Sequence, residues 1–442
     1  MWSDVGWCLA DTTSEWITSI SLPVDGSKGA TIGLAGATRT AIGILVATGL
    51  AVYVGREASP FAVASVLAAY SFGVMLFSPI WGAIADITRR RRTVLIGTGV
   101  LATLSLLLLS VVQNIWLSIA MVAVYAAFAA GFLPVLLTIV SEHGGATNRG
   151  RAIGNFNSAK SVGATGARFL VGVLLALLTS AGFFFVMAIG SLVATIAVVF
   201  VDDPTADGRP LPTLRTLLGE VRRRLIPVGD GRTALTANGL HWLYLAHGFR
   251  NMTISGLMSL LPVYLIVVVG TSATEMGLLL GLGSALQILF MSAFGRVVDA
   301  RGRKSFVVYG MVGSGAFALF AAGATLPGGL LFREIIVGSG FVVRAIAVSA
   351  IFAGTYAFIG DVAPIERESE LMGMLSTVKG IGGVIGPLLL GAVATIWGYE
   401  IAFAGSSLFA FAAAAFVAKG VVESYPAPSI NESPTVAGVT DD

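Results

Sequence analysis

The sequence predicts an all-α membrane protein whose twelve transmembrane helices form two related six-helix bundles, and three observations support this fold class. Apolar residues make up 56% of the 442 residues and charged residues only 12%, which gives a mean hydropathy of +0.88. A soluble protein of this length needs a charged coat, so we expect this chain to be solvated by lipid. Apolar segments long enough to span a bilayer, about 20 residues each, recur along almost the whole chain. The two halves also match each other in sequence.

The apolar segments are bounded by charged residues, proline or glycine, and these boundaries give the expected helices. The first six are expected near 33–55, 61–84, 93–112, 115–140, 152–179 and 181–201, and the second six near 241–270, 274–298, 305–326, 335–359, 370–396 and 399–419.

Polar stretches divide the chain into five expected segments. Residues 202–239 are the only long polar stretch inside the chain, so we interpret them as a linker between two bundles. The tail is rich in Pro, Ser and Thr and is expected to be disordered. The segments are an N-terminal polar extension (1–32), an N-terminal bundle (33–201), a cytoplasmic linker (202–239), a C-terminal bundle (240–420) and a C-terminal tail (421–442).

Basic residues predict the orientation in the membrane. Lysine and arginine gather in alternate loops, and the opposite loops have little beyond Arg56 and Arg333. The positive-inside rule makes the basic side cytoplasmic. Both termini and the linker are therefore expected on the cytoplasmic side of a plasma membrane. The basic loops contain Arg89, Arg90, Arg91, Arg92, Arg149, Arg151, Arg301, Arg303, Lys304 and Arg367.

Composition also excludes several classes of protein. The basic residues form short clusters between apolar segments and follow no continuous surface, so nucleic acid is not an expected partner. The single cysteine, Cys8, has no partner for an intrachain disulfide, and no metal site or cofactor motif is expected. Three histidines without clustered acids make an enzyme a poor interpretation. No G-x-x-x-x-G-K-[ST] loop for ATP is present.

The repeat between the halves is seen in residues that hydropathy alone does not specify. Their spacing is constant within each group and grows along the chain, as small loop insertions in a duplicated six-helix unit would cause. Because each half has an even number of helices, the halves are expected to be parallel repeats. Arg39 and Tyr53 recur as Arg250 and Tyr264; Gly82, Asp86, Arg90 and Arg91 recur as Gly295, Asp299, Arg303 and Lys304; Glu142, Gly154, Lys160, Gly163 and Gly172 recur as Asp361, Gly373, Lys379, Gly382 and Gly391.

The loops GAIADITRRRR (82–92) and GRVVDARGRK (295–304) carry a family resemblance. Both resemble the signature loop of the major facilitator superfamily, approximately G-x-x-x-D-x-x-G-R-[KR]. The second copy matches fully through Gly295, Asp299, Gly302, Arg303 and Lys304. The first copy has Arg89 in place of the pattern's glycine, which puts its tight turn in doubt.

The resemblance covers residues 33 to 420 and implies that charge networks at these loops gate the cytoplasmic opening. Arginine forks there can pair with Glu142 and Asp361, which end the fourth and tenth expected helices. The alternative is that these residues only set topology.

The eleventh expected helix carries GIGGVIGPLLLG (380–391), which looks like the G-x-x-x-G-P motif that the family's antiporters have in the fifth helix. Its different position weakens the inference of antiport. Close helix packing through Gly382 and Gly386, with a kink at Pro387, is the favoured interpretation.

Two arginines are expected near mid-bilayer, Arg168 in the fifth helix and Arg344 in the tenth. Arg39, Arg250, Lys160 and Lys379 are expected nearer the cytoplasmic ends, and no Asp or Glu falls deep within a span. A cavity lined by these residues would be positive, so we hypothesise that the substrate is an anion held between Arg168 and Arg344. Alternatively, each arginine satisfies backbone carbonyls or snorkels between helices.

Polar residues also gather at the start of the seventh expected helix. Tyr244, His247 and Asn251 share one helical face and are candidate substrate contacts. His247 could carry a coupling proton, or it could be an ordinary hydrogen-bonded residue.

The resemblance implies a secondary active transporter that moves a small solute, an organic anion or a drug-like metabolite, by alternating access. We expect transport to be coupled to protons. We expect the protein to be a monomer in the lipid bilayer. The alternative is a non-transporting membrane receptor or a lipid-handling protein on the same scaffold.

Overall fold

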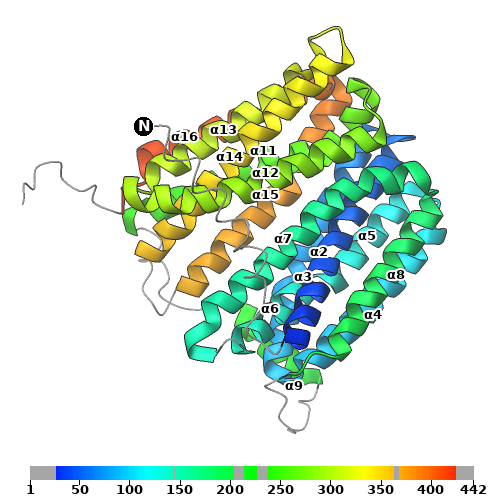
Figure 1. The fold of residues 1–442 in the computed structure, drawn as a ribbon, viewed down its shortest axis with the longest axis vertical. Coiled ribbons are helices and arrows are strands. Elements are labelled where there is room, and N and C mark those ends of the chain that lie inside the picture. The colour runs from blue at the N-terminus through cyan, green and yellow to red at the C-terminus, as the bar shows by residue number, and fades with distance from the viewer. Residues whose placement is uncertain (1–25, 144, 204–213, 226–236, 363–367, 425–442) are drawn as a thin grey trace, which may run out of the picture.

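The computed structural model describes residues 26–143, 145–203, 214–225, 237–362 and 368–424 (Figure 1). Most of the expected N-terminal extension, linker and C-terminal tail lies outside this described part. So do the side chains at 145–151, 292–301 and 368–370. Within the described residues, twelve helices are long and apolar enough to cross a membrane, as the sequence predicted.

The helices follow the expected order with two differences. The first span begins at Gly26, inside the segment expected to be a polar extension, and the linker contains a short helix, α9 (Leu214–Leu225). The N-terminal half consists of α2 (Gly26–Gly55), α3 (Pro60–Thr88), α4 (Arg91–Val111), α5 (Ile115–Ala129), α6 (Phe132–His143), α7 (Gly145–Leu177) and α8 (Ser180–Val199). The C-terminal half consists of α11 (Leu240–Tyr264) with its π-helical end η2 (Leu265–Val269), α12 (Ala273–Arg301), α13 (Lys304–Ala322), α14 (Leu330–Val362), α15 (Glu368–Trp397) and α16 (Tyr399–Gly420).

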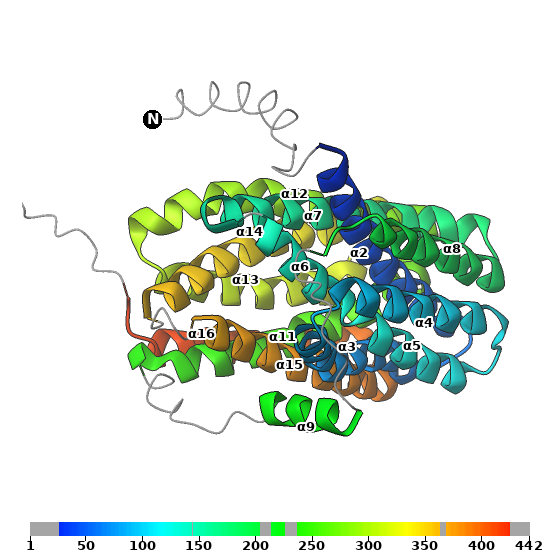
Figure 2. The same ribbon diagram turned by 90° about the horizontal axis from the view of Figure 1, so that it is seen from below.

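The two halves lie side by side as separate bundles, the N-terminal one in blue to green and the C-terminal one in green to red (Figure 1). They meet along α3 with α15 and along α7 with α12, while α11 also contacts α2 and α3. The linker helix α9 packs against α3 at the edge of the bundle (Figure 2).

The fourth span is divided into α5 and α6 at Gly131. Trp81 of α3 packs directly over Gly131, where a side chain would collide with it. Pro134 lies one turn further on and cannot donate a hydrogen bond to the preceding turn. A close contact and a proline therefore break this span, and Trp81 Nε1 donates a hydrogen bond to the Ala127 carbonyl at 2.8 Å across the break.

The hydrophobic cores are unequal at the two ends of the molecule. We call the end with the loops after α3 and α12 the basic end, and the opposite end the far end. The largest cluster of buried apolar residues runs from the middle to the far end and includes residues of both halves, such as Leu50, Val63, Tyr264 and Ala394. At the basic end each half has its own cluster. Among the residues whose side chains are described, apolar burial therefore joins the halves at the far end and not at the basic end.

Small residues form the contact between the halves at the far end. A β-carbon at Gly172 of α7 would collide with the Ala273 carbonyl at the start of α12. Gly391 of α15 lies in the same way against α3, and the Phe61 amide of α3 donates a hydrogen bond to Thr395 Oγ1 at 3.0 Å. Such residues let helix backbones approach closely, so this seam is tight.

Replacement of Gly172 by alanine should destabilise the protein, because the added methyl group separates α7 from α12. Overpacking of this kind costs about 1–3 kcal/mol. The measurement is thermal unfolding in detergent. Gly166→Ala on the same helix is the matched control, because a β-carbon there meets nothing within 4 Å. Equal melting temperatures for the two variants would contradict the tight seam.

Candidate functional site

The first cavity, which we call the arginine cavity, lies in the N-terminal half and has a volume of about 280 Å³. Arg39 and Arg168 are its two charged lining residues in the described part of the chain. Its wall is completed from the C-terminal half by Met258 of α11. The other lining residues are Thr40, Gly43, Ile44, Ala47, Thr48, Leu67, Tyr70, Tyr125, Ala129 and Leu133.

The second cavity, which we call the seam cavity, lies between the halves and has a volume of about 580 Å³. Tyr70 lines both cavities, so they adjoin there. The seam cavity extends toward the basic end as far as Gly82 and Gly373, where β-carbons would meet nothing within 4 Å. Its other lining residues are Ser71, Val74, Met75, Ser78, Pro79, Pro134, Asn251, Ser255, Ser376, Thr377, Lys379, Gly380 and Gly383.

Both cavities are positive. Lys379 is the charged residue among the described lining residues of the seam cavity, and no acidic residue is found among the described lining residues of either cavity. The Lys379 ammonium lies 5.2 Å from the Phe352 ring centre and 5.6 Å from the Tyr356 ring centre. Aromatic faces stabilise such a cation without neutralising it. The cavities are therefore suited to negatively charged groups.

Arg39 is held firmly in the wall of the arginine cavity. Its side chain is only 3% exposed, and its Nη1 donates a hydrogen bond to Ser191 Oγ at 2.8 Å. The guanidinium carbon lies 5.5 Å from the Tyr125 ring centre and 5.1 Å from the Phe132 ring centre. Thr103 also donates a hydrogen bond to Ser191, so the guanidinium has a fixed orientation.

The two arginines expected at mid-bilayer differ in their surroundings. Arg168 lines the arginine cavity, and its Nη1 makes only a long hydrogen bond, 3.5 Å, to the Ala164 carbonyl. Arg344 is buried, with its guanidinium carbon 6.0 Å from the Phe317 ring centre, and is not a described lining residue of either cavity. The structure thus places Arg168, but not Arg344, in the wall of a described cavity.

The three polar residues of α11 are not brought together in one cavity. Asn251 lines the seam cavity and donates a hydrogen bond to the Lys379 carbonyl of α15 at 2.5 Å. Tyr244 is buried and donates to the Leu371 carbonyl at 2.9 Å. His247 is buried against α14, where its Nε2 lies 2.8 Å from Thr355 Oγ1. Tyr244 and His247 are therefore buried in contacts between helices, and of the three residues only Asn251 lines a described cavity.

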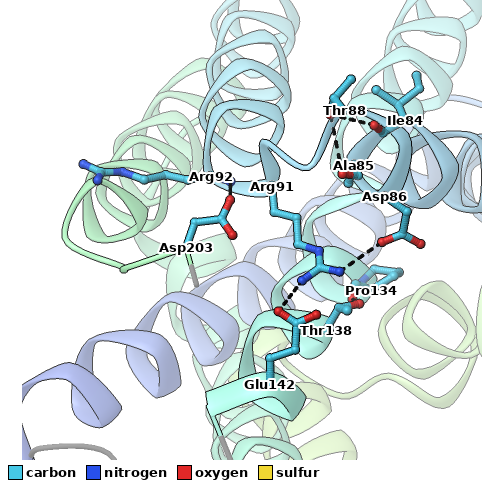
Figure 3. A network of polar contacts seen from close by, with 10 residues as sticks. All are labelled: Ile84, Ala85, Asp86, Thr88, Arg91, Arg92, Pro134, Thr138, Glu142 and Asp203. Atoms are coloured by element: carbon cyan, nitrogen blue, oxygen red, sulfur yellow. Dashed lines mark hydrogen bonds and ion pairs between the residues drawn. The ribbon is translucent and has the colours of Figure 1, made fainter. Parts of the chain in front are cut away.

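The basic end of the N-terminal half carries the charge network that the loop motif predicted (Figure 3). The Arg91 guanidinium lies 2.5 Å from the Glu142 carboxylate and 3.3 Å from the Asp86 carboxylate. It therefore ties together the ends of α3, α4 and α6. Asp203, just after α8, accepts a hydrogen bond from the Arg92 amide at 3.1 Å. A carboxylate at the first turn of α4 is favourable, because that helix end is partly positive.

The C-terminal half repeats this arrangement. Arg303 Nε lies 2.9 Å from the Asp361 carboxylate, as predicted. Glu423, just after α16, accepts hydrogen bonds from the Arg303 and Lys304 amides at 2.9 and 3.0 Å. Gly295 and Asp299 fall among the side chains outside the described part of the chain.

A positive φ recurs at the same position of both motif loops, with a different ψ in each. Gly302 has a φ of 89°, and Arg89, which replaces glycine in the first copy, also has a positive φ of 49°. A left-handed conformation costs a non-glycine residue about 1–2 kcal/mol. The first loop therefore keeps its turn at an energetic cost.

The glycines of α15 serve close packing. β-Carbons at Gly382 and Gly386 would collide with the α11 carbonyls of Gly248 and Met252. Pro387 lies inside the helix directly after them. The sequence favoured this interpretation over an antiport motif.

Sequence reasoning missed the importance of Arg39 and Lys379, which it placed near the cytoplasmic ends. The recurrence of Arg39 as Arg250 was a usable signal, because a repeated charge inside a span indicates a shared role. No signal identified Tyr70 or Tyr125, since tyrosines on apolar helices are common. Among the described residues no group of three or more His, Cys, Asp or Glu could hold a metal ion.

The fold and the cavities define a multi-pass helical membrane protein with a polar site between two repeated bundles. A family model described as Major Facilitator Superfamily matches residues 30–270 and 243–437. The chain therefore belongs to the major facilitator superfamily, whose members are membrane transport proteins and not enzymes.

Curated relatives are transport and resistance proteins, most of them bacterial. The multi-drug resistance efflux pump PmrA of Streptococcus pneumoniae is 23% identical over 80% of this chain and 85% of its own length. The class H tetracycline resistance protein of Pasteurella multocida is 32% identical, but over only 28% of this chain and 29% of its own length. The proton-coupled antiporter flippase LtaA of Staphylococcus haemolyticus is 30% identical over 33% of this chain and 35% of its own length.

Solved structures share the fold at low identity. A variant of the nucleoside transporter NupG superposes with a TM-score of 0.72 at 12% identity, covering 88% of this chain and 99% of that protein. This likeness concerns the fold alone.

The Arg91–Glu142 ion pair should contribute to stability, and a double-mutant cycle measures how much. Arg91→Gln and Glu142→Gln should couple by about 0.5–3 kcal/mol in the free energy of unfolding in detergent. The control cycle pairs Arg92→Gln with Glu142→Gln, because the Arg92 guanidinium donates to the Val199 carbonyl instead. Coupling of the same size in both cycles would show that the pair has no specific role.

Proposed function

We propose that this protein is a secondary active transporter that moves a small organic anion across the plasma membrane by alternating access, coupled to protons. The observation that carries the proposal is the seam cavity between the halves with the arginine cavity adjoining it, whose described charged lining residues are Arg39, Arg168 and Lys379. A buried cation that lacks a carboxylate partner favours an anion as ligand.

Alternating access is supported by the unequal cores. In this conformation the far end is packed and the basic end holds two separate cores. By the positive-inside rule the basic end is cytoplasmic, so the termini are inside and the seam cavity faces the cytoplasm. The motif residues Gly82, Asp86, Arg90, Arg91 and Glu142, with their C-terminal counterparts, then gate this opening. A monomer contains both halves of the site.

Arg168 and Arg344 are the proposed counter-ions from the two halves, and Asn251 is a polar contact in the seam cavity. Tyr244 acts indirectly, because its hydrogen bond to α15 positions α11 beside the cavity. A drug-like metabolite is also compatible with relatives named as resistance proteins. The lack of a carboxylate deep in any span argues against a specialist for cations.

Arg168→Gln and Arg344→Gln should each reduce transport of organic anions at least tenfold, because a charge-assisted bidentate contact is lost. The measurement is uptake from a panel of anionic, neutral and cationic solutes into liposomes that contain the purified protein. Arg56→Gln is the control, since Arg56 lies in the far-end loop after α2. Unaltered anion uptake in both the Arg168→Gln and the Arg344→Gln variant would remove the proposed counter-ions.

His247 is the proposed site of the coupling proton. Its Nε2 contacts Thr355, while its Nδ1 has no hydrogen-bond partner among the described residues. We expect wild-type uptake to respond to a pH gradient and His247→Ala uptake to lose that response. The measurement is uptake in the same liposomes over a range of pH gradients. An unchanged pH dependence in the variant would dispose of this role.

A lipid-handling protein is the second candidate, favoured by the partial match to a protein named as a flippase. Movement of a fluorescent lipid between leaflets of the same liposomes, without uptake of any soluble solute, would favour it. Binding of a solute without movement of solute or lipid would indicate a non-transporting receptor.

A further inference from the structure

The arginine and lysine side chains in the membrane-spanning part of the protein are not matched by carboxylates there. Arg39, Arg168 and Lys379 line the two cavities, and Arg250 and Arg344 are buried within spans of the C-terminal half. The sequence has no Asp or Glu in the middle of any span, so neutralising charge must come from outside the bundle. Unpaired buried charges are costly, and a bound anion removes much of that cost.

Arg39 supplies a particular binding geometry. Its Nη1 is used by Ser191, whereas its Nε and Nη2 are buried and have no hydrogen-bond partner among the described residues. These two nitrogens form the side edge of the guanidinium, a fork that binds carboxylate or phosphate through two parallel hydrogen bonds. The Tyr125 and Phe132 rings and Ser191 fix the plane of this fork.

Other hydrogen-bond donors line the same cavity. The Tyr125 hydroxyl is buried and also has no hydrogen-bond partner among the described residues. The Tyr70 hydroxyl lies over Gly43, where the absence of a side chain makes room for it. Arg168 adds a second positive charge to the same cavity. One cavity therefore combines two guanidinium groups with hydroxyl donors.

We infer that the arginine cavity binds the charged end of an organic dianion, with Arg39 as its principal ligand and the adjoining seam cavity holding the organic body. This inference rests on the proposed function and names the substrate class of that site. Two cationic side chains in a cavity of about 280 Å³ match two negative charges. The seam cavity is larger, and Val74, Met75 and Pro134 give it apolar walls. Because the fork is buried in this structure, neighbouring side chains must move when the anion enters.

Ligand-dependent thermal stability of the purified full chain in detergent tests the inference without requiring transport. The probes are benzoate with one charge, phthalate with two charges on two groups, and phenyl phosphate at a pH where one group carries both charges. At least one dianion should bind at least tenfold more tightly than benzoate. The preferred dianion then shows whether the two charges belong to one group or to two.

Three variants assign the effect to the fork. Arg39→Lys keeps the charge but loses the fork, and it should weaken dianion binding at least tenfold. Tyr125→Phe removes only a hydroxyl and should weaken binding a few-fold without loss of folding. Arg56→Gln should bind as the wild type does. If Arg39→Lys does not fold, Tyr125→Phe still tests the site. Dianion binding as tight in Tyr125→Phe as in the wild type would count against the site.

The outcomes separate the inference from the proposed function. Equal stabilisation by benzoate and both dianions, or wild-type binding by Arg39→Lys, would overturn the inference even if anion transport is observed. Arg39-dependent dianion binding without transport of any solute would support the site and count against the transporter proposal instead.

Discussion

The close approach of the two halves at the far end is the constraint on which the rest of the structure depends. Gly172 and Gly391 let backbones meet there, and a continuous apolar core joins the bundles. Because no comparable core of described residues joins them at the basic end, the two cavities can exist between helices. Packed cores have discrete arrangements, so a change at this seam is expected to move whole bundles.

The second constraint is electrostatic. Positive side chains are gathered where the dielectric constant is low, and the protein gives them aromatic faces and hydroxyl groups in place of carboxylates. Arg39 is oriented by Ser191, while Lys379 stays partly exposed in the larger cavity. Such partners hold the cations in place but leave their charge uncompensated. In the proposed function, a negatively charged ligand supplies the negative charge that the protein does not place beside these cations.

The two halves form the same kinds of interaction at the basic end, a helix-capping carboxylate and an arginine–carboxylate ion pair, with different residues. In each half a carboxylate after the sixth helix caps the third helix, Asp203 in one half and Glu423 in the other. In each half an arginine at the start of the third helix pairs with an acid at the end of the fourth. The turn before that arginine is strained at Arg89 and relaxed at Gly302. The duplication thus preserved the interactions more closely than the residue types.

The sequence by itself determined the twelve spans, the two halves and the charge networks of the motif loops, because hydropathy, repeats and ion pairs at helix ends are local properties. It also placed Arg168 inside a span. Only the tertiary structure decided that Arg39 shares a cavity with Arg168, and that His247 lies in helix packing while Asn251 reaches the seam. The physical reason is that a helix in lipid can be apolar on every side, so its sequence does not reveal which face meets the other bundle.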